Sequence, residues 1–200
     1  MDIFLIEIEK RLKLLPNDNK VLFSALTCEK LLLNYNYFSS LENWGDKSIL
    51  DDPMVLYYEF IKNNIIDEIE LERISRLIED IAPDTEDFNS PLVSYALDAC
   101  CAFEDTINFL KTFDYHYVLN VSSYARDTVD MFIQEIENLD PNDIFLDKKI
   151  HQNKYYQNEF NRQKNILNYL SNITEITPNV ITELRSINSE YGNIIDLSIL

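Results

Sequence analysis

Glycine is almost absent from this chain, which has two glycines, Gly45 and Gly192, among its 200 residues. Phosphate-binding loops, dinucleotide-binding folds and hairpin-rich β architectures all use glycine where φ is positive or where the backbone closely approaches a ligand. The shortage of glycine therefore argues against all three classes of protein.

Cysteine is also scarce, and the three cysteines, Cys28, Cys100 and Cys101, lie on apolar stretches. An odd number of this kind is typical of buried thiols in a reducing compartment rather than of a disulfide framework. The first ten residues, MDIFLIEIEK, have no base ahead of their apolar part, and no apolar run reaches the length of a membrane span. We therefore expect a cytoplasmic protein that does not associate with a membrane.

Basic residues are few, with 17 Lys and Arg against 35 Asp and Glu, for a formal net charge of −18 at pH 7. The imbalance lies in the middle of the chain, where residues 67–88 carry nine acids and two bases, and residues 89–147 carry eleven acids and two bases. A chain of this charge disfavours nucleic acid as a direct ligand, because phosphate binding requires a positive surface. It favours a basic protein partner.

Apolar residues at helical spacing are abundant, and they make up 46% of the chain. Ser90-Pro91 predicts a helix start, and the residues from Leu92 to Phe103 are apolar on almost every side. A helix of this kind belongs inside a bundle. The clearest amphipathic pattern follows it, over residues 117–138.

These patterns predict an all-α fold, in which residues 1–200 form a single-domain bundle of about seven helices. We expect residues 91–113 and 117–138 at its centre. Residues 35–46, YNYFSSLENWGD, are rich in turn-forming residues and predict a connection between helices. Residues 148–171 predict one uninterrupted helix.

Three motifs give the chain a family resemblance. APDTEDF precedes the central helix, YALDAC lies within it, and ARDTVDMFIQE lies on the next helix. Together with an early CEK (Cys28 to Lys30), they resemble the bacterial YjaG-like family of unknown function, domain-of-unknown-function family 416, over about residues 1–172. The resemblance implies a cytosolic, all-α bacterial protein, and it implies no reaction and no catalytic residues.

Asp98 is the most unusual residue, because an unpartnered carboxylate within an apolar helix is costly. One interpretation is a catalytic or ligand-binding acid. The other, which we favour, is a core carboxylate that bridges helices to Arg126, Lys30 or a tyrosine hydroxyl. The same two interpretations apply to Glu29, which lies on another apolar helix.

A carboxylate metal site is a weaker alternative. Its candidate ligands, on different predicted helices, are Glu29, Asp98, Asp127, Asp130 and Glu159. Di-iron bundles also use Glu-x-x-His on two helices, and neither His116 nor His151 has a glutamate three residues before it. No Ser-His or Cys-His nucleophile pair is recognisable either. We therefore predict no metal, no cofactor and no enzymatic activity.

The excess of acids is the feature most open to a functional interpretation. Solvation of outward-facing helix surfaces is one explanation. Charges of one sign at close helical spacing are destabilising, however, and this favours a partner-binding role. The predicted partner-binding residues are Asp67, Glu68, Glu72, Glu79, Asp80, Asp84, Glu86, Asp87, Asp127, Asp130, Glu137, Asp140 and Asp143.

Three functions follow from these observations. The first is an acidic protein-binding module that neutralises a basic protein, in the manner of a bacterial immunity protein paired with a nuclease-like toxin. The second is a housekeeping adaptor or regulator that forms a homodimer through exposed aromatics such as Tyr57, Tyr58 or Trp44. The third is a metal-dependent enzyme built on Asp98 and its neighbouring carboxylates.

Overall fold

The structure, a computed structural model, describes residues 3–199 and is helical throughout its regular elements. Over this range there are nine α-helices and two short 3-10 helices. The α-helices are α1 (Ile3–Leu12), α2 (Asn17–Glu42), α3 (Asp51–Asn63), α4 (Glu68–Ile81), α5 (Leu92–Thr112), α6 (Tyr115–Ile136), α7 (Leu146–Gln152), α8 (Lys154–Leu170) and α9 (Pro178–Glu190). The 3-10 helices are η1 (Lys47–Leu50) and η2 (Leu197–Ile199). The all-α prediction is confirmed, whereas the count of about seven helices is wrong.

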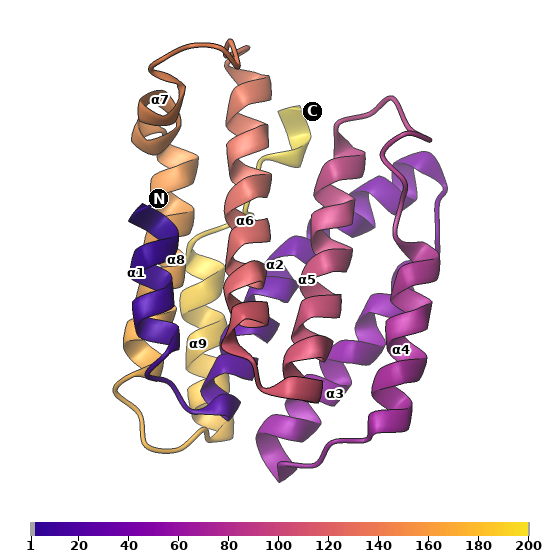
Figure 1. Cartoon of the computed structure of the whole chain (residues 1–200), viewed down its shortest axis with the longest axis vertical. Coiled ribbons are helices and arrows are strands. Elements are labelled where there is room, and N and C mark those ends of the chain that lie inside the picture. Colours follow the sequence, from indigo (N-terminus) through magenta and orange to yellow (C-terminus); the bar gives the residue numbers. More distant parts are fainter. Residues whose placement is uncertain (1–2, 200) are drawn as a thin grey trace.

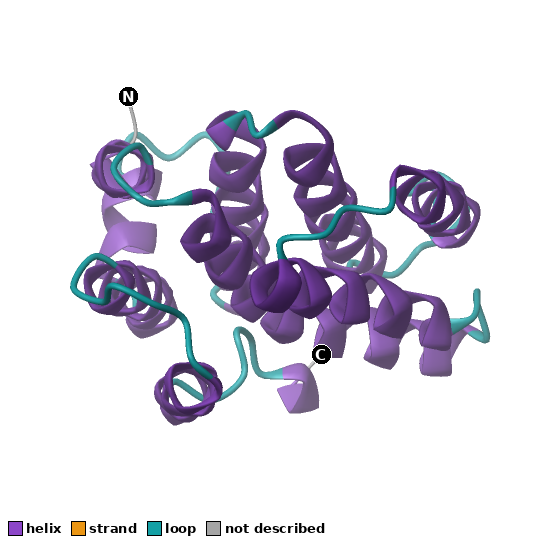
Figure 2. Ribbon diagram, turned by 90° about the horizontal axis from the view of Figure 1, so that it is seen from below, coloured by secondary structure: helices purple, strands orange, loops and turns teal. Residues whose placement is uncertain are grey.

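The centre of the bundle consists of α2, α5 and α6, which pack against one another. Figure 1 shows α4, α5 and α6 side by side, with α2 and α3 behind them and with α1, α7 and α8 at the edge beside α6. Figure 2 looks along the bundle from below, so that most helices are seen nearly end on. Sixteen of the 26 residues of α2 are buried, and this helix is as central as the two that the sequence indicated.

One hydrophobic core includes residues from all nine α-helices. Within residues 3–199, no helix combines the length and the apolar character that crossing a membrane requires.

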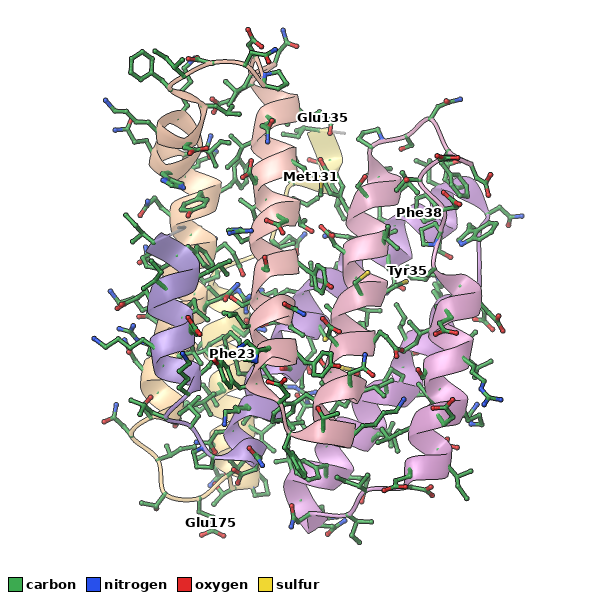
Figure 3. All side chains as sticks on the ribbon, in the orientation of Figure 1. Phe23, Tyr35, Phe38, Met131, Glu135 and Glu175 are labelled. Atoms are coloured by element: carbon green, nitrogen blue, oxygen red, sulfur yellow. The ribbon has the colours of Figure 1, made fainter. Side chains whose placement is uncertain are left out.

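The segment predicted as a connection is largely helix, because α2 continues to Glu42. Tyr35 and Phe38 are 0% exposed, and burial of these large side chains (Figure 3) stabilises a helix that Asn and Ser alone disfavour. The chain leaves α2 through Asn43 and Gly45, both with positive φ. A Cβ on Gly45 would collide with the hydroxyl of the buried Tyr35, and φ is positive there, so this turn requires glycine.

The predicted helix over residues 148–171 is broken at Asn153, which separates α7 from α8. Asn153 has an extended backbone (φ −70°, ψ 143°), and its carboxamide oxygen accepts a hydrogen bond from the Tyr155 amide (2.9 Å). Asparagine favours this N-cap position, because its side chain satisfies an amide that the helix leaves unpaired. The break adds a helix that periodicity alone did not predict.

Candidate functional site

The predicted partner-binding residues fall into two groups that α5 separates, since α5 packs between α4 and α6 (Figure 1). The first group precedes α4, lies on it or follows it in the loop to α5: Asp67, Glu68, Glu72, Glu79, Asp80, Asp84, Glu86 and Asp87. The second group lies on α6 or in the turn after it: Asp127, Asp130, Glu137, Asp140 and Asp143.

Four of these acids hold helix ends or turns. Asp67 caps α4, because its carboxylate accepts a hydrogen bond from the Glu70 amide (3.1 Å). Asp84, Asp140 and Asp143 each accept a hydrogen bond from the backbone amide two residues further along, at 2.8 to 2.9 Å. These four acids therefore stabilise local backbone structure, and Asp143 also forms an ion pair with Lys149 (2.7 Å).

Two other acids have basic neighbours. Glu72 forms ion pairs with Arg76 and Lys111, both at 3.2 Å. The hydrogen bond from Lys111 is the main reason why the pKa of Glu72 lies below its usual range. Asp127 accepts a hydrogen bond from the guanidinium of Arg126 (2.9 Å). Such partly exposed pairs contribute little to stability, since water screens them.

A pocket of about 190 Å³ lies between α4, α5 and α6. Its apolar walls are Ile78, Ala82, Cys100 and Cys101, and its polar lining is Glu79, Glu104, Asp105 and Tyr124. None of these described lining residues is basic. Glu79 is a predicted partner-binding residue, whereas Glu104 and Asp105 were missed because they follow the apolar run that drew attention to Asp98.

Neutral groups hold the carboxylates of this pocket. One oxygen of Glu104 accepts a hydrogen bond from the Ser75 hydroxyl (2.6 Å), and the other is buried without a hydrogen-bond partner among the described residues. Asp105 accepts a hydrogen bond from the Tyr124 hydroxyl (3.3 Å). Burial raises the pKa of Asp105, although hydrogen bonds from Asn120, Asn108 and Tyr124 oppose the rise.

Asp98 lies one helical turn before Cys101 on α5, and its carboxylate accepts a hydrogen bond from the Thr128 hydroxyl on α6 (2.8 Å). The predicted bridge between helices is thus present, with a partner that the sequence analysis did not name. Burial raises the pKa of Asp98 to about 7, the bond from Thr128 lowers it, and the nearby Asp127 carboxylate raises it. A cationic group placed here would favour the charged form of Asp98.

The thiol of Cys101 lies among these acids. Burial raises its pKa to about 11, and the charges of Asp98, Asp105 and Glu104 act in the same direction. The thiolate is the nucleophilic form of cysteine, so this thiol is poorly reactive near neutral pH. Among the described residues, nothing in these surroundings activates the Cys101 thiol as a nucleophile.

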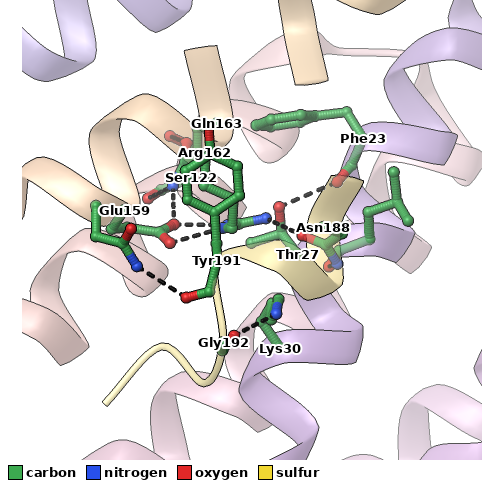
Figure 4. Close-up of polar contacts among 12 residues, drawn as sticks. Phe23, Thr27, Lys30, Ser122, Glu159, Arg162, Gln163, Asn188, Tyr191 and Gly192 are labelled. Atoms are coloured by element: carbon green, nitrogen blue, oxygen red, sulfur yellow. Dashed lines mark hydrogen bonds and ion pairs between the residues drawn. The ribbon is translucent and has the colours of Figure 1, made fainter. Parts of the chain in front are cut away.

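A second polar cluster lies inside the bundle and is shown in Figure 4. Arg162 on α8 is 1% exposed, and its Nε and Nη2 atoms donate to both oxygens of Glu159 (2.7 and 2.6 Å). Its Nη1 atom donates to Asn188 on α9 (3.0 Å). The amide of Asn188 in turn donates to the Leu26 carbonyl oxygen on α2 (3.0 Å).

The same cluster extends to α6 and to the end of the chain. The Gln163 amide donates to Glu159 (2.6 Å) and to the Ser122 carbonyl oxygen on α6 (3.2 Å). Lys30 on α2 donates to the carbonyl oxygen of Gly192. Burial lowers the pKa of Lys30, and the neighbouring Arg162 adds to this effect.

This cluster fixes the fold, since it joins α2, α6, α8 and α9. The sequence analysis placed Glu159 among candidate metal ligands and missed Arg162, although a Glu-x-x-Arg spacing on one helix is a recognisable pair. No group of three or more His, Cys, Asp or Glu side chains suited to hold a metal ion occurs within residues 3–199.

Glu29 and the aromatic residues named for self-association are part of the packing. Glu29 accepts hydrogen bonds from the Tyr58 hydroxyl (3.0 Å) and from Nε of Arg185 (2.9 Å), which joins α2 to α3 and α9. Tyr57 is 0% exposed, and its hydroxyl donates to the Phe103 carbonyl oxygen (2.7 Å). The prediction that Tyr57 is an exposed aromatic is therefore wrong.

The fold and the pocket define the class of this protein: an all-α bundle with an acidic pocket between three of its helices. A family model described as "Protein of unknown function (DUF416)" matches residues 7–194. The chain therefore belongs to the DUF416 family, and the match extends beyond the limit of about residue 172 that the sequence analysis expected.

Comparison with solved structures finds a similar protein, the crystal structure of a DUF416 family protein from Shewanella baltica OS155. The two chains are 25% identical, and they align with a TM-score of 0.84 over 98% of this chain and 97% of the other. Comparison with curated proteins gives no match.

Proposed function

We propose that this chain is a protein-binding module that recognises a basic protein through the face formed by α4, α5 and α6. The pocket between these helices carries the proposal, because Glu79, Glu104 and Asp105 line it and no described lining residue is basic. A lysine or arginine side chain of the partner would bring the missing cation close to these carboxylates. Its aliphatic stem would pack against Ile78 and Ala82.

The exposed acids of α4 and of the loop after it have a different role in the proposal. Glu68, Asp80, Glu86 and Asp87 remain exposed on α4 and in the loop after it. Charges at the rim of an interface mainly steer association, whereas charge pairs buried in its centre mainly slow dissociation. Removal of a rim acid should therefore change the association rate and its salt dependence.

In its finer form, the proposal is that binding neutralises the partner, as an immunity protein does with a nuclease-like toxin. An active site that binds nucleic acid is positively charged, so this acidic face would be complementary to it. The three free cysteines support a cytoplasmic location, because oxidising compartments favour disulfides. The module would need no cofactor.

The test is affinity capture of the tagged chain from its native cytosol at low salt, followed by stepwise washes at rising salt. The expected result is one basic protein, retained stoichiometrically and released by salt. The Glu79→Gln/Asp105→Asn variant should release it at lower salt. The matched control is Glu175→Gln/Glu190→Gln, which removes two exposed acids near α9; Glu175 lies in the loop between α8 and α9 (Figure 3).

Two outcomes would overturn the proposal. Capture of further copies of this chain alone would favour the homodimeric adaptor. Release of a basic protein at the same salt concentration from the pocket variant and from the control would show that the pocket is not the binding site. If the partner is retained as expected, its own activity with and without this chain tests the inhibitory form of the proposal.

A further inference from the structure

A groove of about 830 Å³ lies along α8 and α9. Its lining is mostly neutral, with Glu190 as the one charged residue among the described residues that form it. Four asparagines line it from one side of α8 and the turn after it: Asn158, Asn165, Asn168 and Asn172. Two tyrosines, Tyr169 and Tyr191, also line it. The volume is within the range of about 300–1,000 Å³ that ligand sites occupy.

In each of these asparagine side chains, one of the two polar atoms, the amide nitrogen or the carbonyl oxygen, is hydrogen-bonded within the protein. The amide nitrogens of Asn158 and Asn172 donate to the carbonyl oxygens of Tyr191 (2.9 Å) and Asn168 (2.7 Å). A carbonyl oxygen can only accept, so these bonds fix which half of each carboxamide faces the protein. The Oδ1 atom of each side chain then remains as an acceptor for a ligand.

The other two asparagines follow the same division. The amide nitrogen of Asn165 donates to the Tyr191 hydroxyl, so its Oδ1 atom also remains. Asn168 is the reverse case, because its Oδ1 atom accepts from Nε of Arg11 (3.0 Å) and its amide nitrogen remains as a donor. Among the four asparagines, three thus present a free Oδ1 acceptor, and Asn168 presents its amide nitrogen.

The spacing of the acceptors limits the ligand. Asn158 and Asn165 are seven residues apart on α8, which corresponds to about 10.5 Å along the helix axis. Asn172 follows after seven more residues, in the turn that ends the helix. A suitable ligand therefore presents hydrogen-bond donors at intervals of about 10 Å, together with an acceptor, and it carries no negative charge, because the Glu190 carboxylate would repel one.

A peptide backbone in the polyproline II conformation comes within about 1.2 Å per repeat of this spacing, a difference that the asparagine side chains can span. Its groups repeat on the same side after three residues, or about 9.3 Å, and it has no internal hydrogen bonds, so each N–H remains available. A β-strand repeats on the same side after about 6.8 Å and does not fit the spacing. Grooves lined by aromatic rings, as Tyr169 and Tyr191 line this one, are a known setting for such peptides.

We propose that the α8–α9 groove binds an uncharged peptide segment in the polyproline II conformation. Backbone N–H groups at every third residue of the peptide donate to Asn158, Asn165 and Asn172. The two intervening residues donate nothing, so prolines are accepted there. This site is separate from the acidic pocket, and either proposal can fail without the other.

The test is an NMR titration of the ¹⁵N-labelled protein with the neutral heptapeptide acetyl-Ala-Pro-Pro-Ala-Pro-Pro-Ala-amide. We expect saturable shifts of the side-chain amide signals of the four asparagines. A peptide N-methylated at its central alanine lacks the donor for Asn165 and should bind about tenfold more weakly. This arm uses the unaltered protein, so it does not depend on how a variant folds.

Protein variants give an independent arm. Asn165→Ala should weaken binding of the unmethylated peptide about tenfold. The matched control is Asn89→Ala, which changes an exposed asparagine in the loop before α5, outside the groove lining, and should leave binding unchanged. The proposal is overturned if the shifts do not saturate, if the N-methylated peptide binds equally well, or if the neutral trisaccharide maltotriose produces the same shifts.

Discussion

Glu159 is buried and Asp98 is partly buried, and the protein gives the two carboxylates opposite surroundings. Glu159 is 3% exposed, and it receives two hydrogen bonds from Arg162 and one from Gln163. Asp98 has the Thr128 hydroxyl as its hydrogen-bond partner, and its pKa rises to about 7. The guanidinium compensates the first carboxylate, whereas the hydrogen-bond partner of the second, within residues 3–199, is a neutral hydroxyl.

The comparison shows how an acidic protein distributes its few cations. Arg162 and Lys30 lie inside, where they join helices. On the α4–α5–α6 face, basic residues pair with Glu72 and Asp127. The partly buried Asp98, Glu104 and Asp105 instead accept hydrogen bonds from neutral hydroxyls. A buried pair that is fully hydrogen-bonded stabilises one arrangement of helices, and carboxylates without a cation are available to a partner that supplies one. Four substitutions test this difference.

Arg162→Met should have the largest effect, because it leaves Glu159 buried without its cation. Loss of one member of a buried pair costs about 3–5 kcal/mol, so we expect a large loss in the free energy of unfolding, measured by urea denaturation. The double variant Glu159→Met/Arg162→Met should recover part of this loss, since no charge is then left unpaired. A cost below about 1 kcal/mol for Arg162→Met would contradict the structural role of the pair.

Asp98→Asn should change the pH dependence of stability. The folded-state pKa of Asp98, about 7, lies above its value in the unfolded chain. The folded state therefore binds the proton more tightly, and the contribution is present at low pH and is lost as pH rises from about 4 to about 7.

For the wild type, this loss should be on the order of 3 kcal/mol in the free energy of unfolding between pH 4 and pH 8. Asn keeps an acceptor for Thr128 and does not titrate, so the variant should lose less stability over this range. Parallel curves for the two proteins would mean that Asp98 is not a desolvated acid.

Asp67→Ala separates structural acids from partner-binding ones. Asp67 caps α4 through the Glu70 amide, and loss of such a cap costs about 1 kcal/mol. We expect a lower thermal midpoint with little change in the salt concentration that releases the partner. A clear fall in partner affinity for Asp67→Ala would instead show that Asp67 belongs to the binding surface. The control is Glu68→Gln, which removes an acid from the same helix without removing the cap.

Asp105→Asn should have the smallest effect on stability, a change within about 0.5 kcal/mol. The direction is stabilising at pH 7, because burial raises the pKa of this carboxyl and ionisation therefore costs folding free energy. Association with a basic partner should nevertheless weaken. Destabilisation by more than about 1 kcal/mol would show that the surroundings of Asp105 stabilise its charged form, as those of Glu159 do, and do not disfavour it, as those of Asp98 do.

Helical periodicity was sufficient to predict the all-α class and the positions of α5 and α6, because apolar spacing directly reports a buried face. It failed at residues 35–46, where the buried Tyr35 and Phe38 outweigh the local preference of Asn and Ser for turns. It also failed at Asn153, whose capping role depends on one side-chain hydrogen bond. Tertiary contacts decided both cases.

The site was predicted less well than the fold. Net charge identified the acidic segment, but it did not show which acids cap turns and which line a pocket. Glu104 and Asp105 join Glu79 only when α4 packs beside α5. In the sequence, Arg162 cannot be told from an exposed charged residue of α8. Its burial depends on the packing of α2, α6 and α9 around it. Sequence alone contains neither juxtaposition.

The most direct test of this account is an NMR titration that follows the side-chain carboxyl ¹³C signals of Asp98 and Asp105 in the folded protein. The account expects Asp98 to titrate with a pKa of about 7 and Asp105 to titrate above its usual range, both because burial opposes ionisation. Midpoints for both at or below about 3.9, the ordinary value for aspartate, would contradict it. These carboxylates would then already be compensated, and the face would have no need of a cation from a partner.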